Sequence, residues 1–213
     1  MEKLILTAAF GLTLTLAAEP VRLGEAEVSF AMAMGTAADR KPSLWVRAEQ
    51  MRTVDVVEDT EGCRTVVWRS HPQCGEGFRV TARFRPRQEG GWTYDFAYDG
   101  NAAALDVELI CFPRLTVPRT DATQLFVPDH NGMIVSPDWQ KAKKGAKQAW
   151  NRPFGVHFAA ALTPGQSWYV DQRDDARLEA AFFEVGKDNH LVLRDLTFTG
   201  GYALAGYATI YGS

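Results

Sequence analysis

The sequence predicts an all-β fold, an antiparallel β-sandwich with one or two short helices, and three observations lead to it. Apolar and polar residues alternate with a period of two along most of the chain, as in strands that bury one face. Gly, Pro, Asp and Asn bound these segments at intervals of roughly ten residues, which is typical of antiparallel sandwiches and barrels. Helical patterns between the strands, which a parallel α/β fold would need, are missing.

The alternating segments extend from the N-terminal region to the C-terminus. In chain order, the predicted strands are 27–32, 43–49, 53–58, 64–69, 78–84, 92–98, 105–112, 124–128, 132–136, 154–162, 167–172, 179–185, 190–199 and 202–211. No repeat or internal linker interrupts them. With 213 residues, 46% of them hydrophobic and 23% charged, we expect a single domain over residues 19–213.

One helix is predicted, starting at Ser136. The hydroxyl of Ser136 can accept a hydrogen bond from a free backbone N–H, Pro137 suits the first helical position, and Asp138 complements the helix dipole. Gly145 is expected to end or interrupt this helix.

Four aromatic residues stand at alternate positions in WTYDFAY: Trp92, Tyr94, Phe96 and Tyr98. They share one face of an extended strand, which is either a stacking platform for sugar rings or the wall of a core. The neighbouring segment 78–84 has an apolar face of its own. We expect the two to form a hairpin with Trp92 opposite Phe84, Phe96 opposite Val80 and Asp95 opposite Thr81. Two apolar faces in one hairpin favour the core wall, so the four rings are predicted to be buried.

The N-terminus has the features of an export signal. A short charged start precedes an apolar run and the small residues Ala17 and Ala18, as in a signal peptide over residues 1–18. The alternation in LTLTL leaves a first strand as the alternative. An exported protein would be secreted or periplasmic, where a disulfide is possible. The spacing of the cysteines is equally compatible with a bond between Cys63 and Cys74 and with three unconnected thiols. We expect Cys111 to be a buried thiol.

Charge and motifs narrow the function classes. A net charge of −3 gives no reason to expect nucleic acid as a partner, and no internal stretch is long and apolar enough to span a bilayer. Neither zinc spacing nor a cofactor or nucleophile motif occurs, so we expect no metal, cofactor or catalytic residue. Asp106 and Glu108 lie two apart on one strand and are interpreted as solvated residues rather than a glycosidase pair.

Two loops are the preferred candidates for sugar contact. The turn PDHNG with the start of the predicted helix offers one ring for stacking and several hydrogen-bonding groups, and the turn DQRDD offers carboxylates and a guanidinium. The alternative is that both are simply polar turns. The candidate carbohydrate-binding residues are Asp129, His130, Asn131, Trp139, Asp171, Arg173 and Asp174.

The segments ICFPRLTVPRTDATQLFVPDHNGMIVSPDW and SWYVDQRDDARLEAAFFEVGKDNHLVLRDLTFTG resemble a known domain type. It is the N-terminal β-supersandwich, galactose-mutarotase-like in fold, of bacterial glycoside hydrolases related to endo-α-N-acetylgalactosaminidases. The resemblance implies a non-catalytic module, or a fragment of one, that precedes a C-terminal catalytic barrel and meets glycan. A stand-alone epimerase or lyase and a carbohydrate-binding module are the alternatives.

Overall fold

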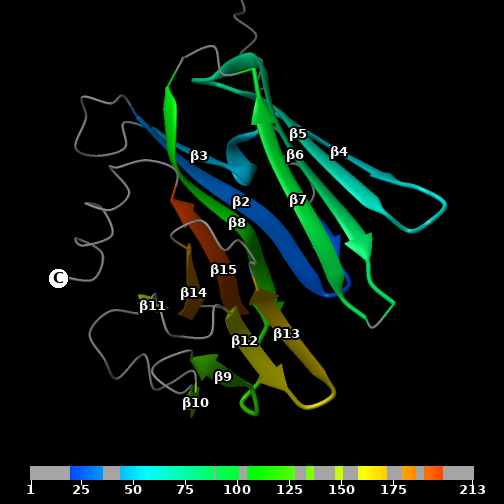
Figure 1. Cartoon of the computed structure of the whole chain (residues 1–213), viewed down its shortest axis with the longest axis vertical. Coiled ribbons are helices and arrows are strands. Elements are labelled where there is room, and N and C mark those ends of the chain that lie inside the picture. Colours follow the sequence, from blue (N-terminus) through cyan, green and yellow to red (C-terminus); the bar gives the residue numbers. More distant parts are fainter. Residues whose placement is uncertain are drawn as a thin grey trace, which may run out of the picture.

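Three antiparallel sheets make up the part of the chain that the structure, a computed structural model, describes (Figure 1). The described residues are 20–35, 44–88, 90–100, 105–127, 133–136, 147–150, 158–171, 179–185 and 190–198. Within them the only helical element is a single 3-10 turn, η1 (Ala48–Gln50). The predicted all-β sandwich is confirmed.

The largest sheet has seven strands in the order β1-β2-β8-β15-β14-β11, with β3 also paired to β2. Its strands are β1 (Val21–Leu23), β2 (Ala26–Gly35), β3 (Leu44–Arg47), β8 (Asp106–Pro118), β11 (Lys147–Trp150), β14 (Glu179–Val185) and β15 (His190–Phe198). Strands β2 and β8 are central, and both are long. From Phe30 onward every residue of β2 is buried, because the alternate positions Ala31, Ala33 and Gly35 are small and the first two lie between larger residues of β3 and β8.

The two other sheets have four strands each. The first, called the meander sheet below, connects its strands in chain order: β4 (Thr53–Glu58), β5 (Arg64–His71), β6 (Gly75–Pro86) and β7 (Trp92–Asp99). The second has the order β10-β9-β12-β13 and comprises β9 (Gln124–Val127), β10 (Met133–Val135), β12 (Phe158–Thr163) and β13 (Gln166–Asp171).

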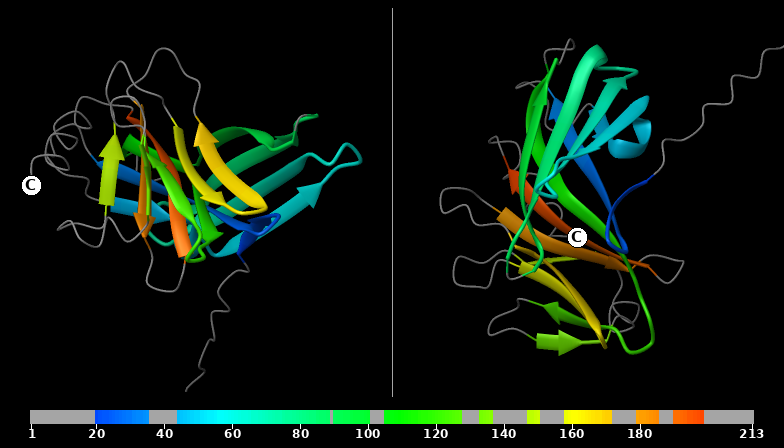
Figure 2. Two further views of the ribbon diagram at one scale, coloured as in Figure 1. Left: turned by 90° about the horizontal axis from the view of Figure 1, so that it is seen from below. Right: turned by 90° about the vertical axis from the view of Figure 1, so that its right-hand side faces the viewer.

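One hydrophobic cluster joins all three sheets. Phe30 of β2 contacts Trp68 of the meander sheet with ring centroids 5.1 Å apart, and Phe112 of β8 stacks on Phe96 at 4.5 Å. The same cluster includes Leu125 and other buried residues of the β9–β13 sheet. Figures 1 and 2 show the two smaller sheets toward opposite ends of the large sheet. The core is therefore the inner face of the large sheet with the two smaller sheets packed against it.

The aromatic row is a core wall along most of its length. Trp92, Tyr94 and Phe96 are half-buried and pack against the cluster, whereas Tyr98 is 40% exposed, so the prediction of burial was wrong for Tyr98. Strand β7 is the edge strand of the meander sheet, so all four rings lack a neighbour on one side, and Tyr98 alone is not packed against the cluster.

The predicted hairpin forms, but its register differs by two residues. Trp92 pairs with Pro86, Tyr94 with Phe84 and Phe96 with Ala82. The turn is shorter than expected, because the N–H of Arg87 already donates to the carbonyl of Gly91 at 3.1 Å. A register shift of two residues leaves every side chain on the same face of the sheet. The predicted faces of the two strands are therefore correct although the predicted pairs are not.

The open question about cysteines is answered by β5. Cys63 precedes this strand and Cys74 follows it, so the length of the strand, about 25 Å, separates them. A disulfide needs Cα atoms less than about 7 Å apart, and all three cysteines are thiols. Cys74 and Cys111 are buried. Burial raises the pKa of the Cys74 thiol.

Several predicted elements lie wholly or partly outside the described residues. The predicted signal over 1–18 and the strand 202–211 are among them, as are residues 137–145 of the helix. Residues 147–150, just after the expected helix end, are strand β11, which pairs with β14. Residues 154–157 of the predicted strand 154–162 also lie outside the described residues, and the observed strand begins at Phe158.

Candidate functional site

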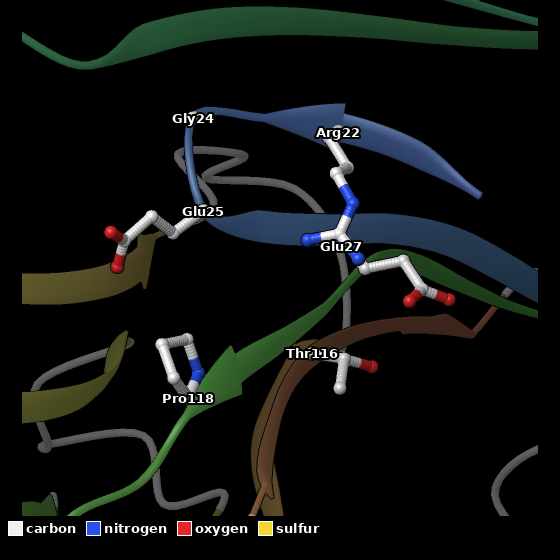
Figure 3. A pocket seen from close by; sticks show the side chains of 6 residues that line it. All are labelled: Arg22, Gly24, Glu25, Glu27, Thr116 and Pro118. Carbon is white, nitrogen blue, oxygen red and sulfur yellow. The ribbon is translucent and has the colours of Figure 1, made fainter.

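A pocket of about 360 Å³ opens on the large sheet beside its first hairpin (Figure 3). It lies at the junction of β1, β2 and the end of β8. Its lining is polar apart from one glycine and one proline, and consists of Arg22, Gly24, Glu25, Glu27, Thr116 and Pro118.

The local sequence explains the hairpin that forms one wall. Leu23 pairs with Ala26, so Gly24 and Glu25 are the two turn residues. Gly24 has φ of 60°, and a glycine with positive φ at the first of two turn positions is the mark of a type II′ hairpin. Because Val21 and Leu23 point into the core, the intervening Arg22 lies on the outer face.

The opposite wall comes from far along the chain. The central pairing of β2 with β8 places Thr116 directly across from Glu27, which in turn pairs with Arg22. Three strands thus bring a guanidinium, a carboxylate and a hydroxyl into one row. Pro118, two residues further along β8, adds an apolar surface at the rim.

The charges of the pocket are not paired with one another. Figure 3 shows the Arg22 guanidinium in the middle of the view, with the carboxylates of Glu25 and Glu27 pointing away to either side. None of the three forms an ion pair with another described residue. The contact that fixes Arg22 uses its backbone, whose carbonyl accepts a hydrogen bond from Nη1 of Arg64 at 2.5 Å.

A second guanidinium follows on the same strand. Arg114 lies two residues before Thr116 and therefore on the same face of β8. Its Nε is buried and has no hydrogen-bond partner, while its carbonyl accepts a hydrogen bond from Ser29 Oγ at 3.4 Å. On the outer face of β8 beside the pocket, Arg114 Nε is therefore a donor that the described residues leave unused.

The candidate sugar-binding residues predicted from the sequence lie almost entirely outside the described part of the chain. Asp129, His130, Asn131, Trp139, Arg173 and Asp174 lie outside the described residues. The backbone of Asp171 is described: it is the last residue of β13 and pairs with Phe158. Strands β9 and β10, on either side of residues 128–132, pair with each other in antiparallel orientation.

The interpretation of Asp106 and Glu108 as two solvated carboxylates was wrong for Glu108. Asp106 is exposed, but Glu108 is only 7% exposed, and its Oε2 has no hydrogen-bond partner. The cause is a β-bulge: Val107 pairs with Met34 and Leu109 with the adjacent Ala33, so Glu108 is an extra residue with no partner opposite it.

Other chemistry-bearing groups do not gather in the described regions. His71 is buried, its Nδ1 accepts a hydrogen bond from the N–H of Gln73 at 3.3 Å, and burial lowers its pKa. Among the residues that are described, no three His, Cys, Asp or Glu side chains are placed to hold a metal ion. No helix in this part of the chain is long and apolar enough to cross a membrane.

A scan against family models gives no match to this chain, and a search of curated proteins gives none either. The residues of the pocket were missed by sequence reasoning. The segment VRLGEAEV does indicate part of the pocket. Its central glycine and its charged residues between apolar ones are typical of a hairpin with one polar face. Nothing local in the sequence indicates that Thr116 and Pro118 complete the pocket.

Proposed function

We propose that this chain is a non-catalytic, carbohydrate-binding β-sandwich module of an exported carbohydrate-active protein, and that glycan binds in the pocket of Arg22, Glu27 and Thr116. The observation that supports the proposal is a polar, open pocket on the large sheet whose charged side chains form no ion pairs with other described residues. Polar groups that line a hollow and are not paired with one another are available to hydrogen-bond a small-molecule ligand.

The pocket contains the donors and acceptors that sugar hydroxyls require. Carboxylates such as Glu25 and Glu27 accept hydrogen bonds from hydroxyls, and a guanidinium donates to ring and hydroxyl oxygens. Thr116 does both. The ring of Pro118 offers an apolar surface for the C–H face of a pyranose.

The wider context of the proposal rests on the sequence resemblance. A β-supersandwich of the glycoside hydrolase type implies that the parent protein is a secreted or periplasmic glycosidase with a catalytic barrel C-terminal to this module. A non-catalytic module has no need of paired acid and base carboxylates, and we propose no catalytic residue in it.

The test is a calorimetric titration of the chain with a panel of oligosaccharides. We expect binding that weakens tenfold or more in Glu27→Gln and in Thr116→Val, because each change removes a hydrogen-bonding group in the pocket. Glu76→Gln, on the meander sheet, is the matched control and should bind like the wild type. Unchanged binding in both pocket variants would move the site elsewhere. In the same samples, turnover of aryl glycosides, or epimerisation, would favour the stand-alone enzyme instead.

A further inference from the structure

We propose that the pocket selects an acidic sugar, a residue of the uronic acid type whose carboxylate binds the guanidinium of Arg22. This inference rests on the proposed function, and it names the substrate class of the same site. Its starting point is the juxtaposition of an unpaired central guanidinium with hydroxyl-binding groups on both sides.

The position of Arg22 makes it the recognition group. Its side chain extends from β1 over β2, so that the guanidinium lies between the two flanking carboxylates in the view of Figure 3. Its backbone is held by Arg64 and by pairing with Glu27, which fixes where the side chain starts. A guanidinium presents parallel N–H groups that match the two oxygens of a carboxylate, and such bidentate pairs are stronger than neutral hydrogen bonds.

A neutral sugar would satisfy this site less well. A ligand that fills the pocket removes water from Arg22, and the loss of hydration of a charged group is unfavourable unless an opposite charge replaces it. Glu27 is the cross-strand neighbour of Arg22, but neither it nor Glu25 forms an ion pair with Arg22, so neither makes the direct contact that would replace this hydration. A carboxylate on the ligand would.

The lining contains one guanidinium and two carboxylates, so its attraction for an anion is local to Arg22 and depends on the two carboxylates pointing away from that group. Arg114, on the same face of β8 two residues from Thr116, adds a second positive charge that has no ion-pair partner among the described residues. The carboxylates of Glu25 and Glu27 lie at the periphery, where ring hydroxyls of a pyranose can donate to them.

The experiment compares an oligogalacturonate with a neutral galactose oligomer of equal length and with a sulfated one, by calorimetry on the full chain. We expect the uronate to bind about tenfold to a hundredfold more tightly than the neutral oligomer, as for a charge-assisted bond. Arg22→Gln should remove this preference, and Arg22→Lys should retain part of it. The matched control is Arg83→Gln, which changes another exposed arginine on a sheet face.

The outcomes separate this inference from the proposed function. Equal binding of the neutral and acidic oligomers, lost in Thr116→Val, would overturn the acidic-sugar inference and leave the glycan site standing. Tighter binding of the sulfated oligomer than of the uronate would also overturn it. An acidic preference that persists in Arg22→Gln would assign the charge recognition to another part of the chain. No binding of any oligomer would overturn both proposals.

Discussion

The outer face of the meander sheet and the pocket face of the large sheet are both charged, but they use their charges differently. On the meander sheet, Arg69 pairs with Asp55 and Arg79 with Asp99, each at 2.7 Å, and Arg85 pairs with Asp95. At the pocket, the corresponding groups of β1 and β2 remain apart. The charged groups of the meander sheet already have partners within the protein. Those of the pocket face do not pair with one another, so they remain available to hydrogen-bond a ligand.

The two regions also differ in how they are fixed. Consecutive hairpins form the meander sheet, so its strands find their partners locally. The pocket depends on the pairing of β2 with β8. In this pairing Glu27 lies opposite Thr116, and the two residues are about ninety positions apart in the sequence. We therefore expect substitutions in the meander sheet to change stability, and substitutions in the pocket to change binding.

The largest expected effect is at the end of the meander sheet. Gly100 has φ of 72°, and a Cβ there would lie 2.0 Å from the carbonyl oxygen of Gly77. Gly100→Ala should lower the free energy of unfolding by about 3–4 kcal/mol, because it adds a backbone clash to the strain of a positive φ. Urea unfolding measures this. Gly91→Ala is the control: its φ of 77° is similar, but nothing lies within 4 Å, so we expect a loss of only about 1–2 kcal/mol. Equal losses would show that the clash relaxes away.

A somewhat smaller loss is expected where the aromatic row contacts the core. Phe96 lies against Phe112 and Phe30, with ring centroids 4.5 and 6.0 Å apart, and is half-buried. Phe96→Ala should lower the free energy of unfolding by about 2–3 kcal/mol, below the range for a fully buried ring. Tyr98→Ala, at the exposed end of the same row, should lose less than about 1 kcal/mol. A larger loss at Tyr98 than at Phe96 would contradict the described packing.

These two positions also show what the sequence could predict. Period-two alternation identifies the strands and their faces, so the core role of Phe96 follows from residues 78–98 alone. It does not show which strand is at an edge, and so it predicted burial for Tyr98 as well. The register depends on the length of the turn, and a shift of two residues leaves the pattern unchanged.

The buried Glu108 and the residues of the pocket were harder to predict for a related reason. Glu108 is buried because a bulge opposite Met34 and Ala33 inserts one extra residue, and no residue type marks that bulge in the sequence. The pocket needs Thr116 beside Glu27, which is a long-range pairing. Polar residues that cluster in a loop are easy to recognise in a sequence. A polar sheet face to which three separate strands contribute is not, because the sequence does not indicate which strands are neighbours.

A third, smaller effect is a dependence of stability on pH. Burial lowers the pKa of His71 below its ordinary value of 6.5, so the unfolded chain binds the proton more readily than the folded one. Stability is therefore complete above about pH 6.5 and falls as the pH drops below that value. Urea midpoints at pH 7.5 and 5.5 should differ in the wild type and differ less in His71→Gln. An identical shift in the variant would assign the effect to other groups.

The smallest stability effect tests the comparison itself. Arg79→Met removes half of an ion pair on the meander sheet and should lower the free energy of unfolding by about 0.2–1 kcal/mol. Arg22→Met removes a charge that has no ion-pair partner among the described residues, and it should leave stability unchanged while removing the preference for an acidic sugar over a neutral one. In 1 M salt, where the screening length falls to about 3 Å, the effect of Arg79→Met should largely disappear. A cycle with Asp99→Asn isolates the pair from the loss of the arginine stem, because only the coupling between the two residues depends on their ion pair. If Arg22→Met destabilised the fold as much as Arg79→Met does, the guanidinium of Arg22 would have a structural partner, and the distinction between a self-neutralised face and a binding face would no longer hold.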